Sequence, residues 1–159
     1  MISCPSPPAV ISEDGLHRYF LSRTWAGSGL TVAFIGLNPS TADAKNDDPT
    51  IRRCMSFAKQ WGGRALWMVN LFAYIATKPM ALRTTVDPIG SQNDAWLDAV
   101  ITKADIVVAA WGNHGHLHNR AQIVRTKYPT YLKALKVTMT GMPSHPLYIP
   151  AATTLVPYG

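Results

Sequence analysis

Three polar side chains that can bind a ligand or move a proton follow apolar stretches of the chain. Asn38 comes two residues after the run 32–36, Asn70 lies near the end of the run 65–72, and His145 lies in a later polar turn. An unpaired buried amide costs on the order of 1 to 3 kcal/mol. Asn70 must therefore bond to its own loop or receive a ligand. Amide and imidazole groups in these positions indicate a site that works by hydrogen bonding and proton transfer.

The elements that must position these side chains alternate along the chain. Short apolar runs typical of buried strands are each followed by a polar, glycine-containing turn, and helical patterns separate them. Asp48 and Pro49 are predicted to open the first helix, and Ser91 is predicted to cap the second. The predicted strands are 32–36, 65–72, 105–111 and 134–140, and the predicted helices are 50–61, 92–103 and 117–127.

This order predicts one α/β domain over residues 1–159. We expect a central, mainly parallel sheet of four strands with helices on its faces, and a site in the loops beyond the carboxyl ends of the strands. Residues 16–25 alternate apolar and basic side chains, which predicts an N-terminal edge strand or hairpin with Arg18 and Arg23 in solvent. Residues 1–12 are expected to form a loose arm.

Composition narrows the classes of protein. The 159 residues are 47% hydrophobic and 15% charged, which indicates a globular chain. No apolar run is long enough to span a bilayer, and residues 1–8 lack the features of a secretory signal, so we expect a cytoplasmic protein without a membrane partner. Cys4 and Cys54 lie too far apart for a zinc or iron–sulfur motif. The net charge of +6 favours a polyanionic partner such as DNA.

Four loop motifs resemble those of the uracil-DNA glycosylase superfamily. Residues 36–40 (GLNPS) are similar to its first motif, and residues 68–71 (MVNL) to the strand whose Asn reads the base. Residues 110–113 (AWGN) look like its Trp-Gly strand end, and residues 144–147 (SHPL) like its His-Pro loop. The resemblance covers roughly residues 31 to 150 and implies a three-layer α/β/α fold.

Roles follow from this resemblance, residue by residue. It implies that Asn38 orients the attacking water, that Asn70 hydrogen-bonds a base flipped out of DNA, and that His145 stabilises negative charge on the departing base. Leu147 would fill the gap that the flipped base leaves in the stack of DNA bases. The resemblance implies no metal or organic cofactor. The other residues that we expect on the base-binding side are Leu37, Ser40, Phe72, Trp111 and Asn113.

Two departures from the superfamily pattern bear on activity. Classical members have Asp where Asn38 stands, so we expect a nearby carboxylate, first of all Asp43 with Asp47 and Asp48 as alternatives, to act as general base. Ser40 replaces the bulky Tyr that excludes thymine in the classical branch. A small residue there is expected to admit a 5-substituted pyrimidine.

The same residues also fit other interpretations. Asn38 fits an ordinary turn, Asn70 a structural amide, and His145 a plain loop histidine. A metal site at His114, His116 and His118 would lack an accompanying carboxylate or Cys.

The combined motifs also look like a family of uncharacterised bacterial and phage proteins. We expect a DNA glycosylase-like hydrolase that acts on DNA or a nucleotide. The alternatives are a non-catalytic nucleobase or nucleotide binder and a phage–host interaction protein of the same fold.

Overall fold

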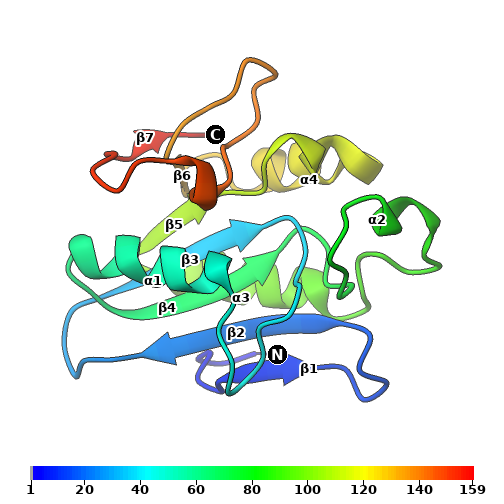
Figure 1. The fold of residues 1–159 in the computed structure, drawn as a ribbon, viewed down its shortest axis with the longest axis horizontal. Coiled ribbons are helices and arrows are strands. Elements are labelled where there is room, and N and C mark those ends of the chain that lie inside the picture. The colour runs from blue at the N-terminus through cyan, green and yellow to red at the C-terminus, as the bar shows by residue number, and fades with distance from the viewer. Residues whose placement is uncertain (1) are drawn as a thin grey trace.

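The protein is an α/β structure built on one mixed seven-stranded sheet (Figure 1). The computed structural model describes residues 2–159. The strand order is β1-β2-β4-β3-β5-β6-β7. Among the described residues no helix is long and apolar enough to cross a membrane. The strands are β1 (Ala9–Ile11), β2 (Arg18–Thr24), β3 (Leu30–Gly36), β4 (Gly63–Asn70), β5 (Ile106–Ala109), β6 (Leu132–Ala134) and β7 (Val156–Pro157). The helices are α1 (Pro49–Gln60), α2 (Ala81–Thr84), α3 (Asn93–Lys103) and α4 (Arg120–Lys127), with 3-10 turns η1 (Asn113–Asn119) and η2 (Pro146–Tyr148).

The α/β class is confirmed, but the prediction of a four-stranded, mainly parallel sheet is wrong. Strands β4, β3, β5 and β6 pair in parallel, whereas β1 and β2 on one side and β7 on the other pair antiparallel. β1 comes from residues that were expected to form a loose arm. Strands of two or three residues, such as β1 and β7, are too short to show an alternating pattern, so only pairing with a neighbour reveals them.

The predicted helix over 50–61 is confirmed as α1. Asp48 is its N-cap and accepts a hydrogen bond from the backbone N–H of Ile51 at 2.9 Å, and Pro49 occupies the first helical position. The second cap prediction is wrong, because α3 follows Gln92 and has no side-chain cap. His118 and Asn119 have positive φ angles, so the predicted helix over 117–127 is divided into η1 and α4.

The predicted strand over 134–140 is also wrong. β6 ends at Ala134, and the chain then turns back on itself, with an antiparallel bridge between Val137 and Pro143. The hydroxyl of Thr138 accepts from the backbone N–H of Met142 at 3.2 Å and supports this turn. Val137 and Met139 therefore belong to a short, exposed hairpin beyond the sheet, whereas Leu135 packs into the core on the α1 side.

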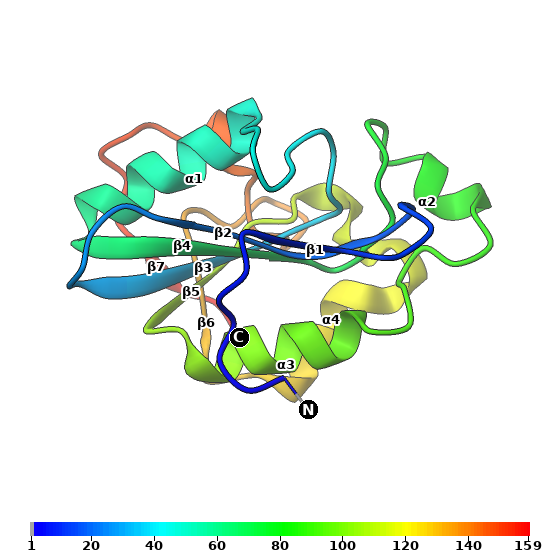
Figure 2. The ribbon, with the colours of Figure 1, turned by 90° about the horizontal axis from the view of Figure 1, so that it is seen from below.

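Helices cover both faces of the sheet (Figure 2). α1 lies on one face, and α3 and α4 lie on the other. Side chains of β4 alternate between the two cores: Leu66 and Met68 pack on the α1 side, and Trp67 and Val69 on the opposite side. The same alternation directs Asn70, the last residue of β4, to the α1 side. The carboxyl ends of β3, β4 and β5 thus meet near the N-terminus of α1.

Candidate functional site

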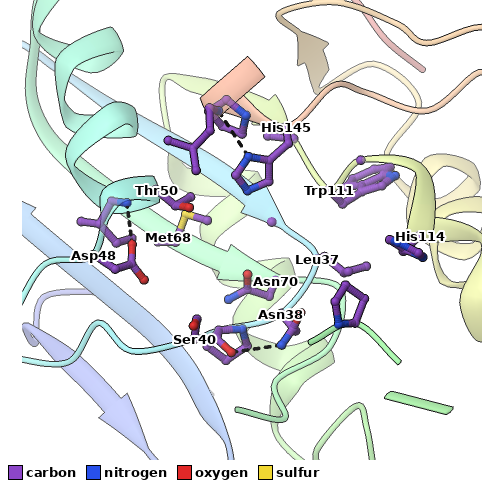
Figure 3. A pocket seen from close by; sticks show the side chains of 18 of the residues that line it. Leu37, Asn38, Ser40, Asp48, Thr50, Met68, Asn70, Trp111, His114 and His145 are labelled. Atoms are coloured by element: carbon purple, nitrogen blue, oxygen red, sulfur yellow. Dashed lines mark hydrogen bonds between the residues drawn. The ribbon is translucent and has the colours of Figure 1, made fainter. Parts of the chain in front are cut away.

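A cavity of about 530 Å³ lies beyond the carboxyl ends of β3, β4 and β5. The N-terminus of α1 and the turn η2 complete its walls, as Figure 3 shows. This is the edge at which open α/β sheets place their ligands. The lining residues are Arg18, Gly36, Leu37, Asn38, Pro39, Ser40, Asp48, Thr50, Ile51, Met68, Asn70, Ala76, Thr77, Pro79, Ala110, Trp111, Gly112, Asn113, His114, His145, Pro146, Leu147 and Tyr148.

Most of the sequence-predicted site residues come together here. Asn38, Asn70 and His145, from three separate segments, line the same cavity. The structure does not bring Asp43 or Phe72 to it. The other predicted residues that line the cavity are Leu37, Ser40, Trp111, Asn113 and Leu147.

Asn70 is buried with an amide that lacks a protein partner. Only 2% of Asn70 is exposed, and its Nδ2 atom makes no hydrogen bond within residues 2–159. Gly36 pairs with Asn70 across β3 and β4, and a Cβ on Gly36 would lie 2.6 Å from the Asn70 Oδ1 atom. The missing side chain of Gly36 therefore makes room for this amide. A buried donor without a partner is the feature expected of a group that binds a ligand.

The backbone at Asn70 is held by side chains from the α3 and α4 side of the sheet. The side-chain amide of Asn93 on α3 donates to the carbonyl oxygens of Asn70 and Leu71, at 3.0 Å each. Arg120 on α4 donates to Leu71 O at 3.0 Å and pairs with Asp94 at 2.7 Å. We call Asn93, Asp94 and Arg120 the supporting cluster. These bonds fix the end of β4, and with it the position of the Asn70 side chain.

Asn38 has a partly structural role. Its Nδ2 atom donates to Pro39 O at 3.0 Å and to Ala76 O at 2.9 Å, which ties the loop after β3 to the loop after β4. Figure 3 shows the bond within the loop. The N–H groups are thus committed to the backbone, and the side-chain oxygen remains for a water or ligand.

His145 presents one defined nitrogen to the cavity side. Its Nδ1 atom accepts from the backbone N–H of Leu147 at 3.2 Å, so the proton of the neutral ring is on Nε2. Burial lowers the pKa of His145, and the nearby Asp48 carboxylate opposes this in part. A neutral imidazole with an Nε2–H donor results. Leu147 and Tyr148, which follow it, are exposed at the rim.

Asp48 is the carboxylate that reaches the site. It is the one acidic residue among the described residues that line the cavity. Asp43 instead accepts from the backbone N–H groups of Lys45 and Asn46 at 2.9 and 2.8 Å, and these bonds lower its pKa. Asp47 pairs with Arg23 at 2.7 Å. The first choice of general base, Asp43, is thus taken up by a local turn, and the carboxylate that lines the cavity is that of the alternative, Asp48.

Phe72 and Asn113 serve the framework. Phe72 is fully buried in the core on the α3 side, with its ring edge-on to His118 at a centroid distance of 5.8 Å. Asn113 lines the cavity, but its Oδ1 atom accepts from the hydroxyls of Thr138 and Thr140 at 2.8 and 2.9 Å. That contact anchors the hairpin after β6 to the site.

Sequence reasoning missed Arg18. It was expected in solvent, yet it is 2% exposed and lines the cavity. β2 runs antiparallel between β1 and β4, so its first residue lies at the edge where β4 ends, and Arg18 N donates to Ala73 O at 2.9 Å. The alternating pattern correctly indicated a strand. It gave no sign that the strand is internal, which is what buries Arg18.

A comparison with protein families matches the part of the chain that forms the cavity. A family model described as a protein of unknown function, DUF1643, matches residues 18–147. The chain belongs to the DUF1643 family. The matched segment contains every residue that lines the cavity except Tyr148. No curated protein and no solved structure matches this DUF1643 protein.

Proposed function

We propose that this DUF1643 protein is a uracil-DNA glycosylase-like enzyme that hydrolyses the N-glycosidic bond of a pyrimidine in DNA. One observation carries the proposal: the unpartnered, buried amide of Asn70 faces the same cavity as a neutral His145 and the Asp48 carboxylate. The resemblance of the loop motifs to that superfamily and the net charge of +6 support a DNA substrate. The helices on both faces of the sheet are compatible with the three-layer fold that the resemblance implies.

Base recognition is assigned to Asn70. A side-chain amide offers an NH₂ donor group and an oxygen acceptor, and these match the carbonyl and N–H on the edge of uracil or thymine. The supporting cluster holds the backbone carbonyls of residues 70 and 71, which leaves little backbone reorganisation to be made on binding. Ser40 is small, which supports a pyrimidine that carries a substituent at C5.

The chemical step follows from the remaining groups. When the bond between the sugar C1′ and the base nitrogen breaks, electrons move onto the base, and the Nε2–H of His145 donates to the oxygen that gains the charge. A water oriented by the side-chain oxygen of Asn38 adds its oxygen to C1′ and gives a proton to Asp48. The base leaves as an anion and is protonated afterwards. A neutral His145 suits this donor role, because it needs no proton from solvent.

A second candidate is a non-catalytic nucleobase or nucleotide binder. It is favoured by Asp48, whose Oδ1 atom already caps α1 through the Ile51 N–H at 2.9 Å. That oxygen is committed to the first turn of the helix and is not free to accept a proton from a water. In this alternative Asn70 still reads the base, but no bond is broken.

The experiment is an assay for abasic sites on single-stranded and duplex DNA that contains uracil, mismatched thymine or 5-substituted pyrimidines. We expect excision of at least one base, and a loss of about 100-fold or more in Asn70→Ala, His145→Ala and Asp48→Asn. Asp43→Asn is the matched control, because its carboxylate lies outside the cavity. Stabilisation of the protein by a base or nucleotide without any abasic sites would favour the binder over the enzyme.

A further inference from the structure

Arg18 is a buried cation with few partners. A guanidinium has five N–H donors. Of these, Nη1 donates to Ala42 O at 2.8 Å, whereas Nε has no partner in the described part of the chain. Burial lowers the pKa of Arg18 to about 10, so the group is still charged at neutral pH. An unpaired buried charge is costly, and proteins normally pair it.

The second buried arginine shows how this fold pairs such a group. Arg120 is 3% exposed, about as buried as Arg18. Its Nε donates to Leu71 O at 3.0 Å and its Nη2 binds the Asp94 carboxylate at 2.7 Å. Arg120 therefore has both a carbonyl and a carboxylate partner. Within residues 2–159, Arg18 has only the carbonyl of Ala42, and it lines the cavity.

The charges around Arg18 do not supply the missing partner. Asp48 and Asp43 favour its charged form and Arg23 opposes it, but within residues 2–159 no carboxylate lies within 4.0 Å of the Arg18 nitrogens. Asp43 is bound to the N–H groups of its own turn, and Asp48 to the first turn of α1. Within residues 2–159 the Nε donor of this cation thus stays without a partner, and Arg18 lines the cavity.

We propose that Arg18 binds a phosphate group of the ligand, so that the site takes a pyrimidine nucleotide or nucleotide unit and not a free base. This inference rests on the proposed function, because it assumes that Asn70 holds the base. The planar fork of a guanidinium matches two phosphate oxygens. A cavity of about 530 Å³ is in the range of small-molecule sites and is larger than a single pyrimidine ring requires. The phosphate is either that of a free nucleotide or the diester next to a flipped base.

The test compares ligands that differ only in phosphate. The probes are thymidine and deoxyuridine, their 5′-monophosphates, and short thymine- or uracil-containing oligonucleotides, and the readout is calorimetric binding to the full chain. We expect the phosphate-bearing probes to bind wild type about 10- to 100-fold more tightly than the nucleosides. Arg18→Met should remove this difference. A preference for the monophosphate identifies the free nucleotide as ligand, and a preference for the oligonucleotide identifies DNA.

A stability measurement separates binding from a structural role. Arg18→Met removes an incompletely paired buried charge and retains an apolar side chain of similar length, so its melting temperature should equal or exceed that of wild type. Arg120→Met is the matched control and should melt at a lower temperature. A melting temperature of Arg18→Met as low as that of Arg120→Met would overturn the inference.

Two binding results would also overturn it: equal affinity of wild type for nucleosides and phosphate-bearing probes, or an undiminished phosphate preference in Arg18→Met. A failure of the Arg18 proposal can be distinguished from a failure of the proposed glycosylase function. Phosphate-dependent binding without excision supports the role of Arg18 and rejects the enzyme. Excision by Arg18→Met with an unchanged KM for the oligonucleotide supports the enzyme and rejects the role of Arg18.

Discussion

Two groups of polar residues lie at the end of β4 on opposite faces of the sheet. They differ in whether their side-chain donors have hydrogen-bond partners. On the α3 and α4 side, the supporting cluster directs the Asn93 amide and the Arg120 guanidinium to the carbonyls of residues 70 and 71. On the α1 side, Asn70 and Arg18 line the cavity, and each has a buried nitrogen without a partner in the described chain. We call Asn70 and Arg18 the cavity pair.

Each group contains an asparagine and an arginine at nearly the same burial, and the supporting cluster also contains the carboxylate of Asp94. Burial alone therefore does not distinguish a structural residue from a binding residue. Partners do, because a buried polar group contributes to stability only when its hydrogen bonds are made. Asn93 and Arg120 donate to the backbone, although the Asn93 Oδ1 atom has no partner within residues 2–159. In the cavity pair it is donors, Asn70 Nδ2 and Arg18 Nε, that have no partner in that part of the chain.

The largest effect on stability is expected when each of the two asparagines, Asn93 and Asn70, is replaced. Asn93→Ala deprives two backbone carbonyls of a donor and opens a small void, so we expect a fall of about 2 kcal/mol in the free energy of unfolding. Asn70→Ala removes an amide without a side-chain partner and should cost less than about 1 kcal/mol. Urea unfolding of both variants measures the difference. Equal losses would mean that Asn70 is as structural as Asn93.

A smaller effect should come from crowding the Asn70 amide. In Gly36→Ala the new Cβ would lie 2.6 Å from Asn70 Oδ1 and 2.8 Å from Met68 Cε, so both side chains must move. We expect a loss of about 1 kcal/mol in stability and a marked loss of nucleotide binding.

A double-mutant cycle checks the cause of this loss. Because Asn70→Ala removes the atom that the new Cβ would strike, the double variant should be more stable than the sum of the single effects predicts. Strict additivity would show that Gly36 does not act through Asn70.

The smallest effect concerns His145 and pH. Burial lowers its pKa in the folded state below the ordinary value of 6.5. As the pH falls through 6.5, the unfolded chain takes up a proton that the folded chain does not, so stability is full above this pH and declines below it. Unfolding of His145→Gln between pH 5 and 8 should show a shallower decline than wild type. Parallel pH profiles would place the His145 ring in solvent-like surroundings.

Much of the candidate site could be predicted from the sequence, because its signals are local. The run 65–72 with a single amide predicted a strand that carries Asn70 at its end, and Asp48-Pro49 predicted the start of α1. The polar turns after successive strands predicted that Asn38, Asn70 and His145 lie together, and the structure brings them to one cavity. Caps, turns and apolar periodicity depend on residues a few positions apart, so they can be read without the fold.

Only the tertiary structure decided which residues complete the site. Arg18 is buried because β2 pairs with both β1 and β4, and the paired residues of β4 lie 41 to 47 positions further along the chain. The choice between Asp43 and Asp48 depended on a turn that binds one carboxylate and a helix that carries the other to the cavity wall. The turn that binds Asp43 is local, whereas the burial of Arg18 and the place of Asp48 at the cavity arise from packing between distant segments. The amino-acid sequence thus determined the polar strand ends and the first helix. The packing of β2 and α1 around them determined that Arg18 and Asp48 line the site.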